Sequence, residues 1–205
     1  DVANNRLTTL PDNIGSLNQL TKLFLESNQI NVLPATFADL SNLIELRLYN
    51  NKLAELPESF GEFNDLLDLY LNDNQLTRLS DNFGNMNNLE RLRLNDNKLD
   101  SVPVSIGNMK NLEELWLQKN QLATLPDEIG VLDSLVILKI DNNILGSIPE
   151  SVGNLDNLKE LNLDNNELIS LPESLCNIYN DLDIFSVSNN KLCSGSYPLC
   201  LTETV

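Results

Sequence analysis

Histidine is absent from the 205-residue sequence, and cysteine occurs only three times. The lack of histidine removes the commonest general base, the usual catalytic triads and most zinc sites. Three cysteines are too few for a scaffold held together by disulfides. No Gly-rich phosphate loop, GxSxG or HExxH motif is present either. We therefore expect no catalytic residues, no cofactor and no bound metal ion.

Long apolar runs are missing, and basic residues are few. No apolar stretch approaches the length of a membrane span. Lys and Arg total 13 against 30 Asp and Glu, which gives a net charge of −17. Such a surface repels nucleic-acid phosphates and anionic lipid headgroups, so we expect no nucleic-acid partner and no membrane insertion. The 32 asparagines form no Asn-x-Ser/Thr site, which weighs against a eukaryotic secreted glycoprotein.

The chain is built from a repeated unit of 23 residues. The unit reads L-x-x-L-x-L-x-x-N-x-L-x-x-L-P-x-x-I-G-x-L, and only its last copy is one residue longer. The alternating L-x-L predicts a short strand with both leucines on one face. A unit this small buries its apolar face only by stacking on its neighbours, which predicts a solenoid.

This pattern resembles the leucine-rich repeat family over nearly the whole chain. The LPxxIGxL half is similar to bacterial repeats and to intracellular scaffolds related to Ras signalling, whereas residues 142–158 are similar to plant extracellular repeats. The resemblance implies an α/β solenoid, a curved horseshoe with a parallel β-sheet on the concave face and 3₁₀ or irregular segments on the convex face. We predict about eight repeats plus a partial first unit over residues 1–190, and a C-terminal cap over residues 191–205.

One asparagine recurs in every unit, and we interpret it as structural. A buried side-chain amide can satisfy backbone groups where the chain leaves each strand. The family resemblance implies that these side chains point inward rather than toward a ligand. The predicted ladder consists of Asn28, Asn51, Asn74, Asn97, Asn120, Asn143, Asn166 and Asn190.

Ligand binding is expected at the x positions of x-L-x-L-x, which line the concave face. The middle column of these positions alternates aromatic and basic residues along six strands: Phe24, Arg47, Tyr70, Arg93, Trp116 and Lys139. Trp, Tyr and Arg are the residues that most often dominate binding energy at interfaces. With Tyr49 and Arg91 from the flanking columns, these residues form the predicted binding face.

Two other interpretations of the middle column stay open. Arg47 can stack between Phe24 and Tyr70, and Arg93 between Tyr70 and Trp116, without any ligand; each exposed cation–π contact contributes about 0.5–1 kcal/mol. Alternatively, the aromatic residues recur on every second strand, roughly 9.6 Å apart, and this spacing suits one disaccharide of an extended glycan.

Cys193 and Cys200 enclose a short segment of turn residues near the C-terminal end. Apolar residues such as Tyr197 are available there to cover the open core. The segment resembles the Cys…Tyr-Pro-x-Cys endings of some secreted bacterial repeat proteins, which implies a Cys193–Cys200 disulfide worth about 2 kcal/mol. We expect Cys176 to remain a buried free thiol, with pairing to Cys193 as an alternative. A further alternative is three reduced cysteines in a cytosolic protein.

The sequence thus predicts an acidic, monomeric, non-catalytic module that binds a protein on its concave face and is secreted or held at the cell surface. One alternative is an intracellular scaffold that docks a small GTPase in the cytoplasm. Another is a glycan-binding or adhesive repeat protein. The first residues carry no polar cap over the core, so we also expect a segment trimmed from a longer repeat protein.

Overall fold

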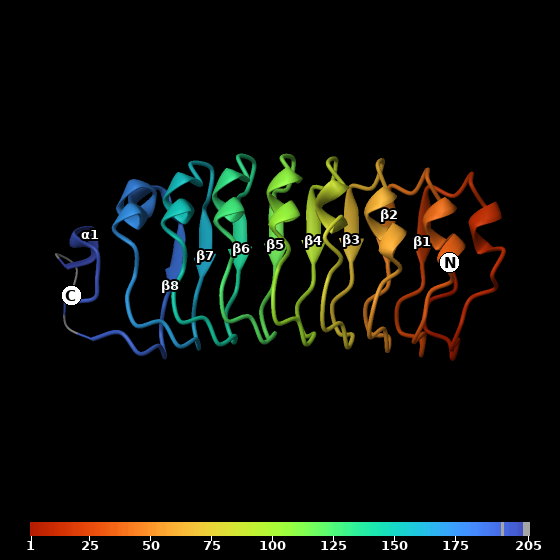
Figure 1. Ribbon diagram of the computed structural model, residues 1–205, viewed down its shortest axis with the longest axis horizontal. Coiled ribbons are helices and arrows are strands. Elements are labelled where there is room, and N and C mark those ends of the chain that lie inside the picture. The colour runs from red at the N-terminus through yellow and green to blue at the C-terminus, as the bar shows by residue number, and fades with distance from the viewer. Residues whose placement is uncertain (194, 203–205) are drawn as a thin grey trace.

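In the computed structural model, which describes residues 1–193 and 195–202, the chain winds into a row of stacked coils (Figure 1). Successive coils each contribute a strand to one open parallel sheet, whose order follows the sequence. The strands are β1 (Lys22–Phe24), β2 (Glu45–Arg47), β3 (Asp68–Tyr70), β4 (Arg91–Arg93), β5 (Glu114–Trp116), β6 (Ile137–Lys139), β7 (Glu160–Asn162) and β8 (Ile184–Ser186). Leu23 pairs with Leu46, and this register continues along the sheet, so each repeat position becomes a column of neighbours.

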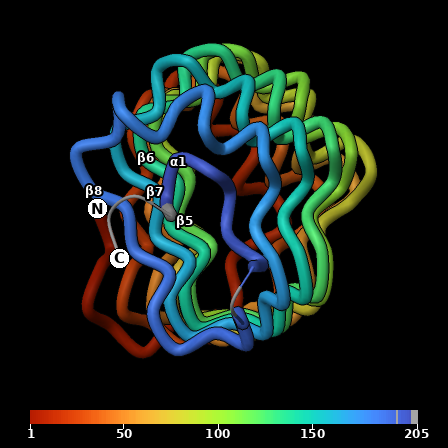
Figure 2. The backbone as a smooth tube through the Cα atoms, turned by 90° about the vertical axis from the view of Figure 1, so that its left-hand side faces the viewer, coloured from red at the N-terminus to blue at the C-terminus, as the bar shows by residue number. Residues whose placement is uncertain are grey.

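Short 3₁₀ helices form the side opposite the sheet, as the sequence predicted. Seen along the solenoid, the coils lie one behind another with a progressive sideways offset, and the labelled strands lie toward the left (Figure 2). The helices are η1 (Ile14–Ser16), η2 (Ala35–Asp39), η3 (Glu58–Glu62), η4 (Phe83–Asn85), η5 (Val104–Asn108), η6 (Asp127–Val131), η7 (Glu150–Asn154), η8 (Glu173–Asn177) and η9 (Tyr179–Asp181). Six of them follow a proline such as Pro34, whose fixed φ turns the chain out of its extended course.

The core lies between the sheet and the 3₁₀ helices. The strand leucines Leu46 and Leu48 are fully buried, and Phe37, Phe60 and Phe83 stack with their ring centres 6.3 Å apart. The 3₁₀ helices approach one another closely: a Cβ atom added at Gly84 would lie 1.8 Å from the carbonyl oxygen of Ser105. Glycine is therefore required there by the contact between neighbouring coils.

The ladder asparagines tie each coil to the one before it. Oδ1 of Asn97 accepts the Leu76 N–H at 2.9 Å, and Nδ2 of Asn97 donates to the carbonyls of Leu71 and Leu94, both at 3.0 Å. The same pattern of one accepted and two donated bonds recurs at all eight positions. These positions are Asn28, Asn51, Asn74, Asn97, Asn120, Asn143, Asn166 and Asn190.

The residue before each ladder Asn has a positive φ. The values lie between 54° and 57°, in the left-handed region that is costly for most side chains. Asn50, Asp73 and Asp96 are of the types that tolerate it, whereas Lys119 is not. The sequence analysis did not predict this left-handed turn, although Asn or Asp occupies six of the eight positions and no glycine does.

The C-terminal end corrects the cysteine prediction. Cys176 of η8 is bonded to Cys200 of α1 (Leu199–Thr202), with their Cα atoms 5.5 Å apart, and Cys193 is a free, exposed thiol. The predicted Cys193–Cys200 bond and the predicted free thiol at Cys176 are therefore both wrong. Residues 194 and 203–205 of the predicted cap lie outside the described residues.

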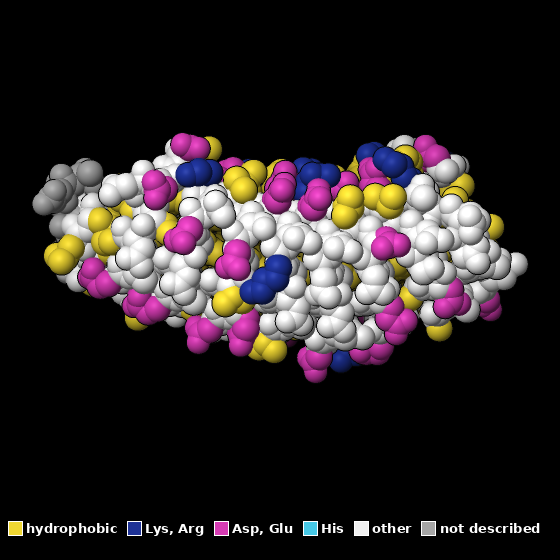
Figure 3. Space-filling model, turned by 90° about the horizontal axis from the view of Figure 1, so that it is seen from above, with side chains coloured by type: hydrophobic (Ala, Val, Ile, Leu, Met, Phe, Trp, Pro, Cys, Tyr) yellow, Lys and Arg dark blue, Asp and Glu magenta, His cyan; other side chains and the backbone are white. Residues whose placement is uncertain are grey.

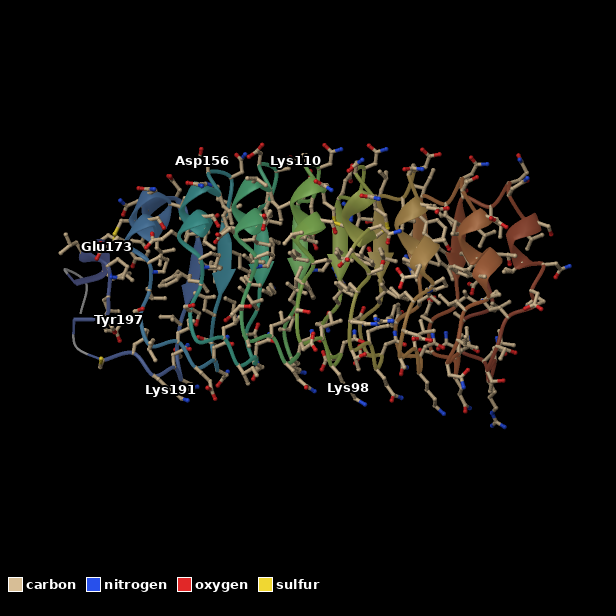
Figure 4. All side chains as sticks on the ribbon, in the orientation of Figure 1. Lys98, Lys110, Asp156, Glu173, Lys191 and Tyr197 are labelled. Carbon is tan, nitrogen blue, oxygen red and sulfur yellow. A yellow bond between two sulfur atoms is a disulfide. The ribbon has the colours of Figure 1, made fainter. Side chains whose placement is uncertain are left out.

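The course of the chain explains the pairing. Helix α1 crosses the open end of the solenoid inside the outline of the last coil (Figure 2), and Leu201 is buried against the core. Leu171 N–H donates to the Ser196 carbonyl at 3.1 Å and holds the incoming segment. The crossing carries Cys200 to the 3₁₀ side, where the disulfide lies near Glu173 (Figure 4). Tyr197 lies in the same segment and packs on the core.

We predict that Cys200→Ser destabilises the protein by about 3 kcal/mol, because the bond closes a loop between residues 24 apart in sequence. Cys193→Ser should change the free energy of unfolding by less than about 0.5 kcal/mol, since it removes an exposed thiol. Urea unfolding without reductant measures both, and mass spectrometry after alkylation should find one free thiol in the parent protein. Equal losses in the two variants would contradict the observed pairing.

Candidate ligand-binding face

The register of the sheet places the middle-column side chains in a single row. Strands β1 to β6 contribute, in order, Phe24, Arg47, Tyr70, Arg93, Trp116 and Lys139. We call this set the aromatic–basic row, and all six side chains are half-buried. Lys and Arg side chains are visible along the upper edge of Figure 3, which is the sheet side of the molecule.

Cations and rings stack continuously along the aromatic–basic row. The guanidinium carbon of Arg47 lies 4.4 Å from the ring centre of Phe24 and 5.8 Å from that of Tyr70. Arg93 lies 5.2 Å from Tyr70 and 4.0 Å from Trp116. The stacking contacts that the sequence left open as an alternative are thus present, and Lys139 extends them, with Nζ 4.6 Å from the Trp116 ring centre.

This stacking covers the ring faces that a sugar would need. Tyr70 is flanked by Arg47 from β2 and Arg93 from β4, and Trp116 by Arg93 and Lys139. A glycan stacking on either ring would have to displace a cation that contributes about 0.5–1 kcal/mol. The glycan alternative remains a prediction, and no feature of this geometry favours it.

Carboxylates of the preceding column neutralise the cations of the row. The Glu45 carboxylate lies 2.5 Å from Nη2 and 2.7 Å from Nε of Arg47, and 2.8 Å from Nζ of Lys22. Further along, Lys139 pairs with Glu160 at 3.0 Å. The row contains three basic residues and no acid, but ion pairs with the neighbouring columns make this part of the face nearly neutral. These pairs were missed because each column was read separately.

Two arginines of the face have raised pKa values. For Arg91 the main cause is its hydrogen bonds to Asp68, which outweigh partial burial. For Arg47 burial acts in the opposite direction, and the hydrogen bond and charge of Glu45 outweigh it. Arg91 is therefore committed to Asp68 and serves to hold β3 against β4, rather than being available to a ligand.

The pKa of Glu45 is lowered. Burial alone would raise it, but the hydrogen bonds and charges of Lys22 and Arg47 outweigh that effect. The Glu45 side chain is therefore an anchor that fixes two cations on neighbouring strands. Nothing in the sequence had singled it out, although its place between Lys22 and Asp68 in one column was visible.

A shallow depression of about 340 Å³ lies in the middle of the face. It is lined by Arg47, Tyr49, Tyr70, Asn72 and Arg93. The structure therefore brings Tyr49 beside the aromatic–basic row, as the predicted binding face requires. Asn72, which the sequence analysis did not single out, lies just after the end of β3 and completes the lining.

Within residues 1–193 and 195–202, no group of three His, Cys, Asp or Glu side chains is placed to hold a metal ion. In the same residues, no helix has the length and apolar character needed to cross a membrane.

Comparison with known proteins agrees with this architecture. Leucine rich repeat models match residues 1–53 and 20–76, a two-copy model matches 87–129, and a single-repeat model matches 157–178. This chain belongs to the leucine-rich repeat (LRR) family. No curated protein sequence matches it.

Solved LRR structures superimpose on almost the entire chain. An LRR protein of Leptospira interrogans is 36% identical over 92% of this chain and 48% of its own, with a TM-score of 0.86. The plant peptide hormone receptor RGFR1, solved with RGF2, is 28% identical over 93% and 32% of the two chains, with a TM-score of 0.83. The LRR ectodomain of the receptor kinase GASSHO1/SCHENGEN3 from Arabidopsis thaliana, solved with CASPARIAN STRIP INTEGRITY FACTOR 2, is 29% identical over 96% and 27%, with a TM-score of 0.72. This chain thus spans less than half the length of each.

We predict that Glu45→Gln lowers the free energy of unfolding at pH 7 by about 1.5 kcal/mol, because two cations lose a charged acceptor. Since the folded pKa of Glu45 is lowered, its contribution is present above the unfolded value of about 4.3 and disappears as pH falls through the folded value. Urea unfolding from pH 7 to pH 3 should show the parent and variant curves converging.

Glu167→Gln is the matched control. Glu167 pairs with Lys191 at 3.0 Å, but both side chains are more than half exposed. Glu167→Gln should lower the free energy of unfolding by less than about 0.5 kcal/mol. A Glu45→Gln difference that stays constant down to pH 3 would show that the charge of Glu45 is not what stabilises the face.

Proposed function

We propose that this LRR chain is a non-catalytic module that binds a protein or peptide on its sheet face, outside the cell. The observation that carries the proposal is the aromatic–basic row with the adjoining depression. Together they concentrate Trp, Tyr and Arg, the side chains most often found as binding hot spots, on one surface. Repeat solenoids use such extended sheet faces to present many side chains to one partner.

The order within the row supports binding to a partner. Arg47 is held by Phe24 on one side and by Glu45 at its edge, and Trp116 is held between two cations. Side chains that are already fixed lose little conformational entropy when a ligand arrives. Binding of a partner would therefore cost little side-chain entropy, because these side chains are already ordered.

The neighbouring structures support a peptide or protein as the ligand class. RGFR1 is described as a peptide hormone receptor in complex with RGF2, and GASSHO1/SCHENGEN3 was solved in complex with CASPARIAN STRIP INTEGRITY FACTOR 2. Both resemble this chain over more than 90% of its length. The ligand itself does not carry over, because identity is below 30%.

Two features support an extracellular location. The Cys176–Cys200 disulfide is of a kind that persists in oxidising compartments and is rare in the cytosol. One solved neighbour is itself the ectodomain of a membrane receptor kinase. An intracellular scaffold would have to keep this bond, which closes the C-terminal end of the core, in a reducing environment.

We predict that linear peptides selected from a phage-displayed library against the immobilised protein bind the sheet face. Trp116→Ala and Tyr49→Ala should each weaken the selected peptides at least about ten-fold, as expected for hot spots. Isothermal titration calorimetry with purified variants measures the change, and circular dichroism checks that each variant folds.

Val104→Ala is the control, since Val104 is 65% exposed on η5, on the opposite side of the solenoid. It should leave the affinity unchanged. Failure to select any peptide, or peptides equally sensitive to Val104→Ala and Trp116→Ala, would argue against binding on the sheet face.

A further inference from the structure

The lining of the central depression is unusual for so acidic a protein. The chain carries 30 acidic residues among 205, yet the lining contains none. All five of its side chains donate hydrogen bonds: two guanidiniums, two phenols and one amide. The depression therefore has five hydrogen-bond donors and no carboxylate in its lining, although the two phenols and the amide can also accept hydrogen bonds.

The two arginines of the lining differ in how far they are satisfied. Arg47 uses Nε and Nη2 on Glu45, at 2.7 and 2.5 Å, and its Nη1 lies 4.0 Å from Glu26. Arg93 has one ion pair, with Nη2 3.6 Å from Glu114. Its buried Nε has no hydrogen-bond partner among the described residues. Arg93 is thus the less fully paired of the two cations.

Unsatisfied polar atoms gather beside Arg93. Among the described residues, six buried side-chain nitrogen or oxygen atoms lack a partner, and four of these belong to the coils of β4 and β5: Arg93 Nε, Asn95 Oδ1, Trp116 Nε1 and Gln118 Oε1. A buried polar atom without a partner costs about 1–3 kcal/mol. Of these four atoms, only Arg93 Nε and Trp116 Nε1 are donors that a carboxylate could satisfy, and of the four residues only Arg93 lines the depression.

We propose that the depression is a subsite for an acidic side chain of the protein ligand. The ligand's carboxylate binds the guanidinium of Arg93, which its single ion pair with Glu114 leaves incompletely paired, and the hydroxyls of Tyr49 and Tyr70 donate from the walls. The amide of Asn72 already donates one hydrogen bond to Asp73 at 2.7 Å and has its second N–H for the ligand. Guanidinium and carboxylate are matched in shape as well as charge. The carboxylates that contact the lining are each already engaged with a lining residue: Glu45 with Arg47, Glu114 with Arg93, and Asp73 with Asn72. Acidic residues beyond roughly 8 Å are largely screened at physiological ionic strength.

This inference rests on the proposed function but is tested apart from it. Trp116 is the only tryptophan, and its ring centre lies 4.0 Å from Arg93. A carboxylate that draws Arg93 toward the depression alters the contact between Arg93 and Trp116. Tryptophan fluorescence therefore reports occupancy of the subsite without knowledge of the natural ligand.

The experiment titrates the protein at pH 7 with acetyl-Gly-Glu-Gly-amide and, separately, with acetyl-Gly-Gln-Gly-amide, at constant ionic strength. The expected result is a saturable fluorescence change with the Glu peptide only. Arg93→Gln should weaken the affinity for the Glu peptide at least ten-fold. Arg93→Lys should weaken it several-fold, because lysine keeps the charge but not the planar guanidinium. Arg78→Gln, which removes an exposed cation outside the sheet, should leave it unchanged.

Other outcomes overturn the inference. Identical responses to the Glu and Gln peptides, or a response that survives in folded Arg93→Gln, would show that no carboxylate subsite exists. If sodium sulfate saturates the response at a much lower concentration than the Glu peptide does, the occupant is a sulfate or phosphate group and the proposed carboxylate is wrong. If library peptides bind the face without a preference for Asp or Glu, the inference fails while the proposed function stands.

Discussion

The structure depends on a single hydrogen-bonding arrangement, the asparagine side chain at the exit of each strand. Each ladder amide accepts one backbone N–H from the preceding coil and donates to two backbone carbonyls, one in the preceding coil and one in its own. Those backbone groups are buried in segments outside the sheet, where they have no partner from regular secondary structure. The amide therefore allows an irregular turn to be buried in every coil, and the coils to stack at a constant register.

Constant register is what creates a functional surface. Because Arg47 lies directly beside Tyr70, and Tyr70 beside Arg93, the alternation of basic and aromatic residues from one repeat to the next becomes a physical stack. The same register places Glu45 within reach of cations from two strands. The stack and the ion pairs together fix the side chains of the sheet face before any ligand binds. Arg93 is less fully paired than Arg47, since its Nε has no hydrogen-bond partner among the described residues.

Most of the fold could be predicted because each position of the repeat has a fixed structural role. The L-x-L positions form the strands, Pro34 and its equivalents precede the outer 3₁₀ helices, and the recurring Asn points inward. The cap could not, because it has no repeat to copy. Its cysteine pairing depends on α1 crossing the core, a tertiary event that spacing between Cys193 and Cys200 does not reveal. On the face, the cation–π stack followed from one column, whereas the neutralising carboxylates and Asn72 required the relation between columns.

Native-state hydrogen exchange tests the central role of the asparagine ladder most directly. The amides of Leu53, Leu76, Leu99 and Leu122 donate to ladder side chains and belong to no strand or helix. The account predicts that they exchange as slowly as strand-flanking amides such as Leu94, which donates to the carbonyl of Trp116 at 2.8 Å. Rapid exchange at the four leucines, with Leu94 still protected, would contradict it.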